Sequence, residues 1–174
     1  MSDTIGFTVQ EEKWEHREVV RLTFEAPDRP VNVLTPEVMA SLKKILDDLE
    51  RQPPSAVILQ SDKQDIFIAG ADINVIAAIK NPAEAAALAE QGRNILWKLH
   101  TIRCPTFAAI DGVALGGGLE LALFCDYRIV SDHPKTRLGL PEVNLGIIPG
   151  FGGTQMLPRI VGLTAALDLI LTCR

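Results

Sequence analysis

The sequence has few of the residues from which metal centres and disulfide frameworks are built. Its 174 residues include three histidines and three cysteines. Cys104, Cys125 and Cys173 are widely spaced, form no CxxC pair and have no neighbouring histidine that would complete a metal set. An odd number of separated thiols also argues against a disulfide framework. We therefore expect reduced cysteines in an intracellular protein without a metal site.

A strong charge of one sign and long apolar runs are also missing. The net charge of -5 gives no general attraction for nucleic acid or for an anionic membrane surface. No apolar run approaches the roughly 20 residues that a membrane span needs. The N-terminus lacks a basic region followed by an apolar core. The sequence thus predicts a cytoplasmic protein with no membrane span and no nucleic-acid partner.

Three common nucleotide-binding and catalytic motifs are absent. The glycine-rich segment that begins at Gly116 reads GGGLEL, so it is not the GxGxxG motif of dinucleotide-binding loops. No GK[ST] is present, which excludes a phosphate-binding Walker loop. Ser61 and Ser131 have no GxSxG setting, which argues against a serine hydrolase triad.

What the sequence does contain is an alternation of strand-like and helix-like segments, in a chain long enough for one domain with a substantial core. Strands are expected at 7–9, 19–24, 55–60 and 127–131, and helices at 35–51, 81–103, 117–124, 154–157 and 162–171. The charged segment 11–18 is expected to be a turn between the first two strands. This alternation predicts an α/β fold in one domain, 1–174. Because the last apolar helix ends at Arg174 without a polar cap, we expect the chain to be a fragment of a longer protein.

The most informative stretch is 106–120, TFAAIDGVALGGGLE. It predicts a strand, then the three glycines 116–118, then the start of a helix. Unpaired amides at such a helix start can bind a charged or polarised oxygen. Three interpretations are open: a dinucleotide loop, an oxyanion site in which the Gly117 amide faces a reacting carbonyl, or close packing of the helix start on a sheet.

Two carboxylates lie in apolar surroundings on different elements. Glu120 falls in the first turn of the expected helix, and Glu142 lies between Pro141 and Val143. They could converge as an acid and base pair with raised pKa values. The structural alternatives are that Glu120 caps its own helix and that Glu142 pairs with an arginine, either Arg137 or Arg159. Asp72 is expected to cap the helix that follows it.

Four ordered motifs together resemble the enoyl-CoA hydratase/isomerase, or crotonase, family. They are FIAGADI at 67–73, AAIDGVALGGGLELAL at 108–123, CDYRIV at 125–130, and LGLPEVNLGIIPGFGGTQMLPRIVG at 138–162. Within the family the chain looks most like the N-terminal part of multifunctional fatty-acid oxidation complex α chains. The resemblance implies a crotonase-like spiral of ββα units that is truncated in its C-terminal helical region.

The resemblance also implies a reaction and the residues that perform it. The amides of Ala71 and Gly117 would hold the thioester oxygen of an acyl-CoA, within a substrate-binding set completed by Gly70, Asp72, Ile73 and Gly116. In hydration of a trans-2-enoyl-CoA, Glu120 would be the base and Glu142 the proton donor. Isomerisation of an enoyl-CoA, or binding of acyl-CoA without turnover, are the alternatives. No cofactor is implied, because coenzyme A is part of the substrate.

Two further expectations concern binding. The segment RPVNVL at 29–34 resembles the family's early CoA-contacting loop, so Arg29, Val31 and Val33 are candidate CoA contacts; Arg29 could meet a phosphate or could be solvated. The loop 147–155, IIPGFGGTQ, would wall the acyl pocket, and its Phe151 stands where many relatives have a smaller residue. The implied partners are a second copy of the chain or, in a multifunctional complex, a thiolase β chain.

Overall fold

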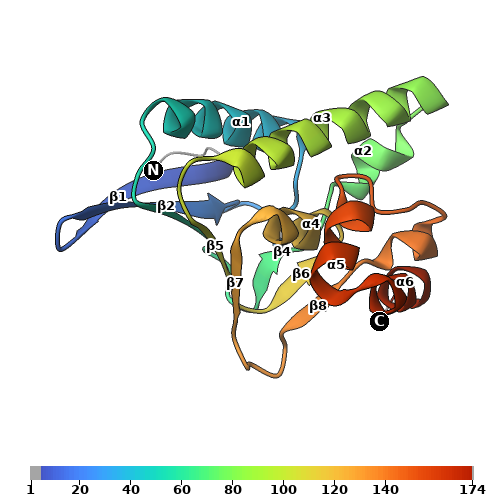
Figure 1. Ribbon diagram of the computed structural model, residues 1–174. Coiled ribbons are helices and arrows are strands. Elements are labelled where there is room, and N and C mark those ends of the chain that lie inside the picture. The colour runs from blue at the N-terminus through green and yellow to red at the C-terminus, as the bar shows by residue number, and fades with distance from the viewer. Residues whose placement is uncertain (1–4, 174) are drawn as a thin grey trace.

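The computed structural model describes residues 5–173, which form two sheets and a surrounding set of helices (Figure 1). The larger sheet has the strand order β1-β2-β3-β5-β7. It contains the antiparallel hairpin β1 (Gly6–Trp14) and β2 (Arg17–Glu25), followed by the parallel strands β3 (Ala56–Ser61), β5 (Thr106–Ile110) and β7 (Tyr127–Val130). The smaller parallel sheet contains β4 (Ile66–Ile68), β6 (Val113–Leu115) and β8 (Arg137–Gly139).

The order of strands along the chain makes the fold a spiral of ββα units. From β3 onward each pair of consecutive strands sends its first strand to the larger sheet and its second to the smaller one. A helical segment follows each pair, and after the first two pairs it returns the chain to the start of the next pair. After β4 these are α2 (Ile73–Ala77) and α3 (Pro82–Thr101), after β6 α4 (Gly117–Phe124), and after β8 the 3-10 helix η1 (Pro141–Leu145). The predicted α/β class and spiral arrangement are confirmed.

The expected helix starts are formed by the residues that the sequence suggested. Thr35 caps α1 (Pro36–Arg51) by accepting a hydrogen bond from the Val38 amide, and Asn81 caps α3 in the same way. A side-chain acceptor at this position satisfies one of the free amides of a helix start. Asp72 likewise caps α2, as predicted. In Figure 1, α1 and α3 lie side by side over one face of the larger sheet.

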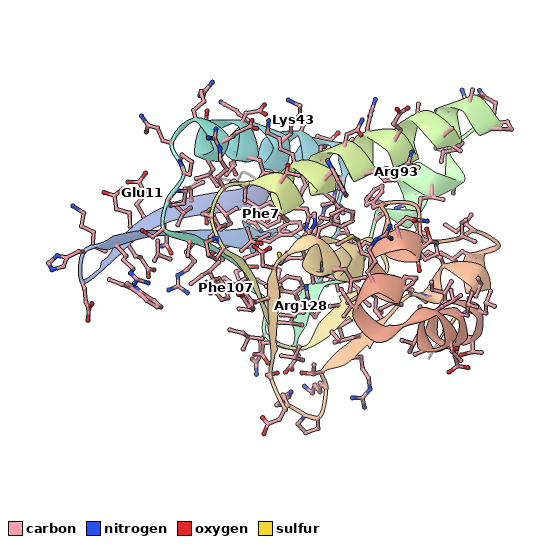
Figure 2. The ribbon with its side chains drawn as sticks, in the orientation of Figure 1. Phe7, Glu11, Lys43, Arg93, Phe107 and Arg128 are labelled. Carbon is pink, nitrogen blue, oxygen red and sulfur yellow. The ribbon has the colours of Figure 1, made fainter. Side chains whose placement is uncertain are left out.

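The core lies between the sheets and the helices, and α4 runs through it. All eight residues of α4 are buried. Figure 2 shows Phe7 of β1 beneath the helices, whereas Glu11 on the same strand and Lys43 on α1 point outward. Phe7 packs on Phe24 with ring centroids 4.9 Å apart. A helix buried on all sides cannot face water, so the polar groups of α4 must find partners inside the protein.

Several element boundaries differ from the sequence expectation. The hairpin turn contains only Glu15 and His16, because the charged residues on either side continue the strands. The central apolar run is divided into β5 and β6 at Gly112, whose φ is +86° and whose missing β-carbon would overlap the Asp65 backbone. α5 (Gly153–Val161) continues through Pro158, beyond the expected end at 157, and α6 (Leu163–Thr172) ends the described chain.

Candidate active site

Two backbone amides point toward one place because β4 and β6 are adjacent and parallel. Ala71 follows β4 and Gly117 follows β6, at the same end of the small sheet. A β-carbon at position 117 would lie 3.4 Å from the Ala71 nitrogen. Within the described part of the chain, neither of these two amides donates a hydrogen bond. Free amides at the positive end of a buried helix are suited to bind a developing oxyanion.

The turns that carry these amides are held by their neighbours. The Leu34 amide donates to the Gly70 oxygen at 2.8 Å, and the Asp72 amide donates to the Leu34 oxygen at 3.3 Å. The Gly116 amide donates to Gly139 of β8 at 2.9 Å. Each free amide is therefore next to a hydrogen-bonded one, which fixes its direction before any ligand binds.

The three glycines 116–118 serve different purposes. Gly116 has a φ of +50°, and a β-carbon there would lie 2.9 Å from Glu142 Oε1. A β-carbon at Gly118 would lie 2.2 Å from the Ile68 carbonyl oxygen, so this glycine lets α4 pack on β4. The close-packing interpretation thus holds for Gly118, whereas Gly117 presents a free amide.

Glu120 is buried in the first turn of α4 and binds the start of a different helix. Its side chain is 2% exposed. Its Oε1 accepts hydrogen bonds from the Phe151 amide at 2.9 Å and from the Gly153 amide at 2.7 Å, at the beginning of α5. The alternative that Glu120 caps its own helix is therefore wrong. Burial raises the pKa of Glu120 to about 7, the charge of Glu142 adds to the rise, and the backbone amides at 151–153 oppose it.

Glu142 lies at the start of η1 and is also buried. Its Oε2 has no hydrogen-bond partner among the described residues. Burial raises the pKa of Glu142 above its usual range. Neither arginine considered in the sequence pairs with it, because Arg137 donates to backbone oxygens of the preceding turn and Arg159 donates to Gln155. A buried carboxyl with one unpartnered oxygen is expected to be neutral or to bind a ligand through that oxygen.

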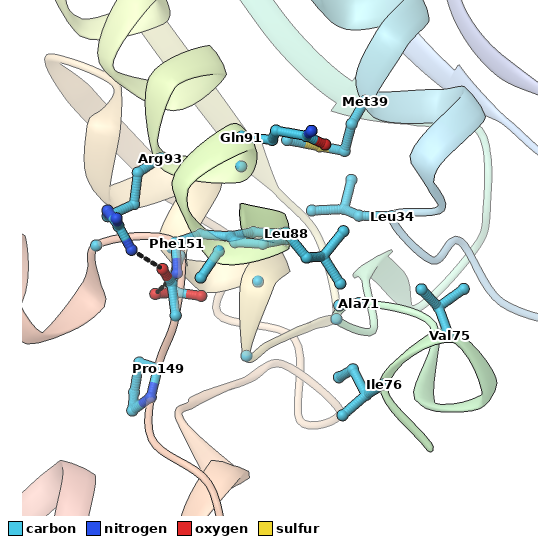
Figure 3. Close-up of a pocket in the computed structure, with 18 of the residues that line it drawn as sticks. Leu34, Met39, Ala71, Val75, Ile76, Leu88, Gln91, Arg93, Pro149 and Phe151 are labelled. Atoms are coloured by element: carbon cyan, nitrogen blue, oxygen red, sulfur yellow. Dashed lines mark hydrogen bonds between the residues drawn. The ribbon is translucent and has the colours of Figure 1, made fainter. Parts of the chain in front are cut away.

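The free amides and both carboxylates line one cavity of about 1040 Å³ (Figure 3). Most of its wall is apolar and comes from α1, α2, α3, η1 and the loop before α5. The predicted site residues in the wall are Gly70, Ala71, Asp72, Ile73, Gly116, Gly117, Glu120 and Glu142. An apolar cavity with a few convergent polar groups is the usual form of a small-molecule site.

The predicted CoA contacts are placed differently. Arg29, Val31 and Val33 do not line the cavity, whereas Leu34 of the same segment does. Arg29 is half-buried, and its Nη1 lies 3.4 Å from Asp72 Oδ2. The segment is anchored by the buried Asn32, whose Nδ2 donates to the Phe24 oxygen. No contact with coenzyme A is tested by this geometry, so the assignment of these three residues stays a prediction.

The sequence analysis placed Phe151 in the pocket wall but missed Gly92 of α3 and the contact between these two residues. Phe151 from the loop and Gly92 from α3 touch, since a β-carbon at Gly92 would lie 2.3 Å from Phe151 ring atoms. The available signal was a glycine inside a long helix, where it weakens the helix and so requires a packing reason. Among residues 5–173, no group of three or more acidic, histidine or cysteine side chains is placed to hold a metal ion.

A spiral of ββα units that presents two free amides and two buried carboxylates to one apolar cavity defines a crotonase-fold protein. The chain belongs to the enoyl-CoA hydratase/isomerase family, whose model matches residues 15–174. The predicted family is therefore confirmed. No helix in the described residues is both long enough and apolar enough to span a membrane.

Known relatives and solved structures support this assignment. The chain is 48% identical over 160 residues to a fatty acid oxidation complex subunit alpha from Aliivibrio fischeri, covering 91% of this chain and 23% of that one. An enoyl-CoA hydratase from Bacillus anthracis superposes with a TM-score of 0.85 at 35% identity, over 97% of this chain and 63% of that one. Pseudomonas aeruginosa DspI gives 0.85 at 33%, over 99% and 67%. The chain thus spans about a quarter of the curated relative's length.

Proposed function

We propose that the chain hydrates trans-2-enoyl-CoA thioesters to 3-hydroxyacyl-CoA in fatty-acid β-oxidation. The observation that carries the proposal is the convergence of two free amides with two buried carboxylates of raised pKa in one cavity. Support also comes from relatives described as an enoyl-CoA hydratase and as a fatty acid oxidation complex subunit. Coenzyme A enters as part of the substrate.

The amides of Ala71 and Gly117 would receive the thioester oxygen. Water attacks Cβ while electrons move from the double bond onto that oxygen, which gains negative charge as an enolate forms. The two amides favour this enolate over the neutral thioester, and one such donor is typically worth ~3 kcal/mol of barrier. Because the donors are backbone groups held by bonded neighbours, they need no rearrangement during the reaction.

The glutamates would handle the protons. Glu120 takes a proton from water as its oxygen attacks Cβ, and Glu142 gives a proton to Cα. This division needs one ionised and one protonated carboxyl. Burial raises the pKa of both carboxyls, and the charge of Glu142 raises the pKa of Glu120 further, which favours a state in which only one of the two is ionised. A proton transfer within the pair, directly or through water, then restores the starting state.

Each carboxylate can be tested with a conservative substitution. With trans-2-butenoyl-CoA as substrate, we expect Glu120→Gln and Glu142→Gln each to slow the loss of the conjugated thioester's absorbance by about 10²- to 10⁴-fold. Circular dichroism must show that the fold is kept. Turnover by both variants at the parent rate would contradict the proposal.

A second reaction of the same site is isomerisation of a 3-enoyl-CoA to the 2-enoyl isomer. It needs a single carboxyl to move a proton between two carbons, and the unpartnered Oε2 of Glu142 favours that group. In Glu120→Gln, retained isomerisation with lost hydration would assign the shuttle to Glu142. Loss of both reactions would show that hydration and isomerisation each require Glu120 as well as Glu142.

The partners of the chain are proposed from its relatives. The Aliivibrio fischeri relative is a subunit of a fatty acid oxidation complex, which supports assembly of this chain with another subunit, and we propose that this subunit is a thiolase β chain. Self-association into a homo-oligomer is the alternative. Light scattering of the purified chain, alone and with a thiolase β chain, separates the two. The cytoplasmic location also stays a prediction.

A further inference from the structure

The direction of the free Ala71 amide is set by a short parallel pairing with the segment 32–34. Leu34 lies opposite Ala71 in an isolated parallel bridge, and both residues line the cavity (Figure 3). The Leu34 amide donates to the Gly70 oxygen at 2.8 Å, and the Asp72 amide donates to the Leu34 oxygen at 3.3 Å. In such a bridge one residue bonds the two neighbours of the residue opposite, whose own amide therefore points away from the pairing. This is why the Ala71 amide has no acceptor among residues 5–173.

The register of this pairing decides whether the amide stays free. Amides along an extended segment point alternately to opposite sides, so a shift by one residue exchanges the bonded amides for the free ones. A one-residue shift of the segment 32–34 would therefore engage the Ala71 amide and withdraw it from the cavity. A smaller displacement would already weaken the donor, because a hydrogen bond requires close alignment. The free amide thus depends on how firmly the segment 32–34 is held.

Asn32 anchors this segment to the larger sheet. It is fully buried, and its Nδ2 lies within hydrogen-bond distance of three acceptors. These are the Phe24 oxygen of β2 at 3.1 Å, Ser61 Oγ of β3 at 2.9 Å and Asp62 Oδ1 at 3.3 Å. A carbonyl oxygen can only accept, so the nitrogen of the side-chain amide must face it. The backbone oxygen of Asn32 accepts from the Ala69 amide at 2.8 Å. One residue thus joins β2 and β3 to the segment that follows β4.

The acceptors do not need Asn32 in order to be satisfied. The Phe24 oxygen also accepts from the Asp62 amide at 3.1 Å. Ser61 Oγ also accepts from the Lys63 amide at 3.0 Å. Asn32 itself carries a cost, because its Oδ1 is buried without a partner among the described residues. It does not line the cavity, so it cannot touch a substrate there. What this amide contributes is therefore the position of its own segment.

We propose that Asn32 is a positioning residue of the oxyanion site, which holds the segment 32–34 in register so that the Ala71 amide stays free and directed into the cavity. This inference rests on the proposed function, because the amide's task there is to receive the thioester oxygen. The Gly117 amide is held separately, through the bond of the preceding residue to β8. Loss of the Asn32 side chain should therefore weaken one of the two donors and leave the other in place.

The first part of the test is amide hydrogen exchange, which requires no substrate. In Asn32→Ala, the amides of Leu34, Ala69 and Asp72 should exchange about tenfold or more faster than in the parent, because their hydrogen bonds make the pairing. The amides of β3 in the same sample report any general loss of stability, against which the three amides are compared.

A matched control is available at the opposite end of the same sheet. Thr106, at the start of β5, is also buried, and its Oγ1 donates to Asp126 Oδ2 at 2.9 Å. Thr106→Val removes this buried side-chain hydrogen bond and keeps the shape of the residue. It should lower stability without a selective effect on the amides of Leu34, Ala69 and Asp72.

The second part separates binding from turnover. With trans-2-butenoyl-CoA, kcat should fall about ten- to hundredfold in Asn32→Ala while KM changes less than about threefold, because an oxyanion donor acts mainly in the transition state. Thr106→Val should keep both constants. Ser61→Ala removes one acceptor of the Asn32 amide and should give smaller changes in exchange and in kcat. It should have no further effect on kcat in the Asn32→Ala background, and it provides the test if Asn32→Ala does not fold.

The outcomes separate the inference from the function on which it rests. Unchanged exchange of the three amides in folded Asn32→Ala and Ser61→Ala, or parent kinetics in both, would overturn the inference and leave the proposed function standing. A higher KM with the parent kcat would also overturn it, since Asn32 would then support binding of the substrate and not the oxyanion. A folded parent that neither binds nor turns over the thioester would overturn the proposed function, and the role of Asn32 in the pairing would then be decided by the exchange rates alone.

Discussion

Two glycine-rich turns in this molecule open helices in opposite ways. The turn 116–118 opens α4 with the Gly117 amide free, whereas the turn 150–153 opens α5 with the amides of Phe151 and Gly153 bound to Glu120. Both turns present backbone donors at the positive end of a helix. The turn 116–118 leaves the Gly117 amide available to an oxygen from outside the protein, whereas the turn 150–153 donates its amides to the buried side chain of Glu120. The same backbone arrangement thus leaves a donor free in one turn and holds a buried carboxylate in the other.

Blocking the free turn should have the largest effect of the substitutions that test this comparison. Gly117→Ala would place a β-carbon 3.4 Å from the Ala71 nitrogen, in the space where a thioester oxygen would bind. Loss of one oxyanion donor typically costs about 10²- to 10³-fold in kcat, and we expect a fall of this size. Steady-state kinetics with trans-2-butenoyl-CoA measures it, with Gly150→Ala in the second turn as the control. Equal kinetics in the two variants would remove the distinction between the turns.

The turn 150–153, whose amides bind Glu120, should affect how the stability of the protein depends on pH. Because the pKa of Glu120 is raised from 4.5 to about 7 in the folded protein, the folded state binds more protons than the unfolded chain between these values. Stability therefore falls as the pH rises from about 4.5 to about 7 and changes little above that range. Glu120→Gln keeps an oxygen acceptor for both amides and removes the charge.

The melting temperatures of the parent and of Glu120→Gln, each measured between pH 5 and pH 8, test this expectation. We expect the glutamine variant to melt roughly 5 °C above the parent at pH 8 and near it at pH 5, with the difference growing through the interval. Glu142→Gln is the comparison, since the pKa of that carboxyl is also raised by burial but its Oε2 has no donor. A parent with no pH-dependent loss of stability over this interval would show that Glu120 is not held as a costly buried charge.

The start of a third helix, α2, extends the comparison, and a substitution there is expected to have the smallest effect of the three. Its cap Asp72 lies 3.4 Å from Arg29; the two side chains are 16% and 37% exposed, and ion pairs near the surface contribute about 0–1 kcal/mol. If Arg29 contacts a CoA phosphate, Arg29→Ala should raise KM about three- to fivefold with little change in kcat. If it only supports Asp72, KM should stay the same while the melting temperature falls slightly.

The residues that sequence reasoning identified are those whose signal is local. Gly117, Glu120 and Glu142 stand in motifs where glycine follows a strand or a carboxylate interrupts an apolar run, and the structure brings all three to one cavity. Asp72 was recognised as a cap for the same reason, because its partner amide lies two residues away. A local pattern was sufficient for Asp72, whereas the pairing of the Ala71 and Gly117 amides, which lie far apart in the chain, was predicted only from the family resemblance.

What the sequence could not supply are contacts between distant segments. The donors that hold Glu120 lie 31 and 33 residues further along the chain, and the ring that requires Gly92 comes from another element. The division of one apolar run into β5 and β6 depends on the approach of the Asp65 backbone to Gly112. These features are set by how the strands pair, which hydrophobic periodicity does not encode.

The hydrogen bond between the Phe151 amide and Glu120 has an evolutionary consequence. The donor belongs to the main chain, so every residue type except proline supplies it. The ring on the same residue is free to vary in size, subject to the space that Gly92 leaves. A single codon change at position 151 can therefore alter the shape of the cavity wall while the backbone anchor of the carboxylate is inherited intact.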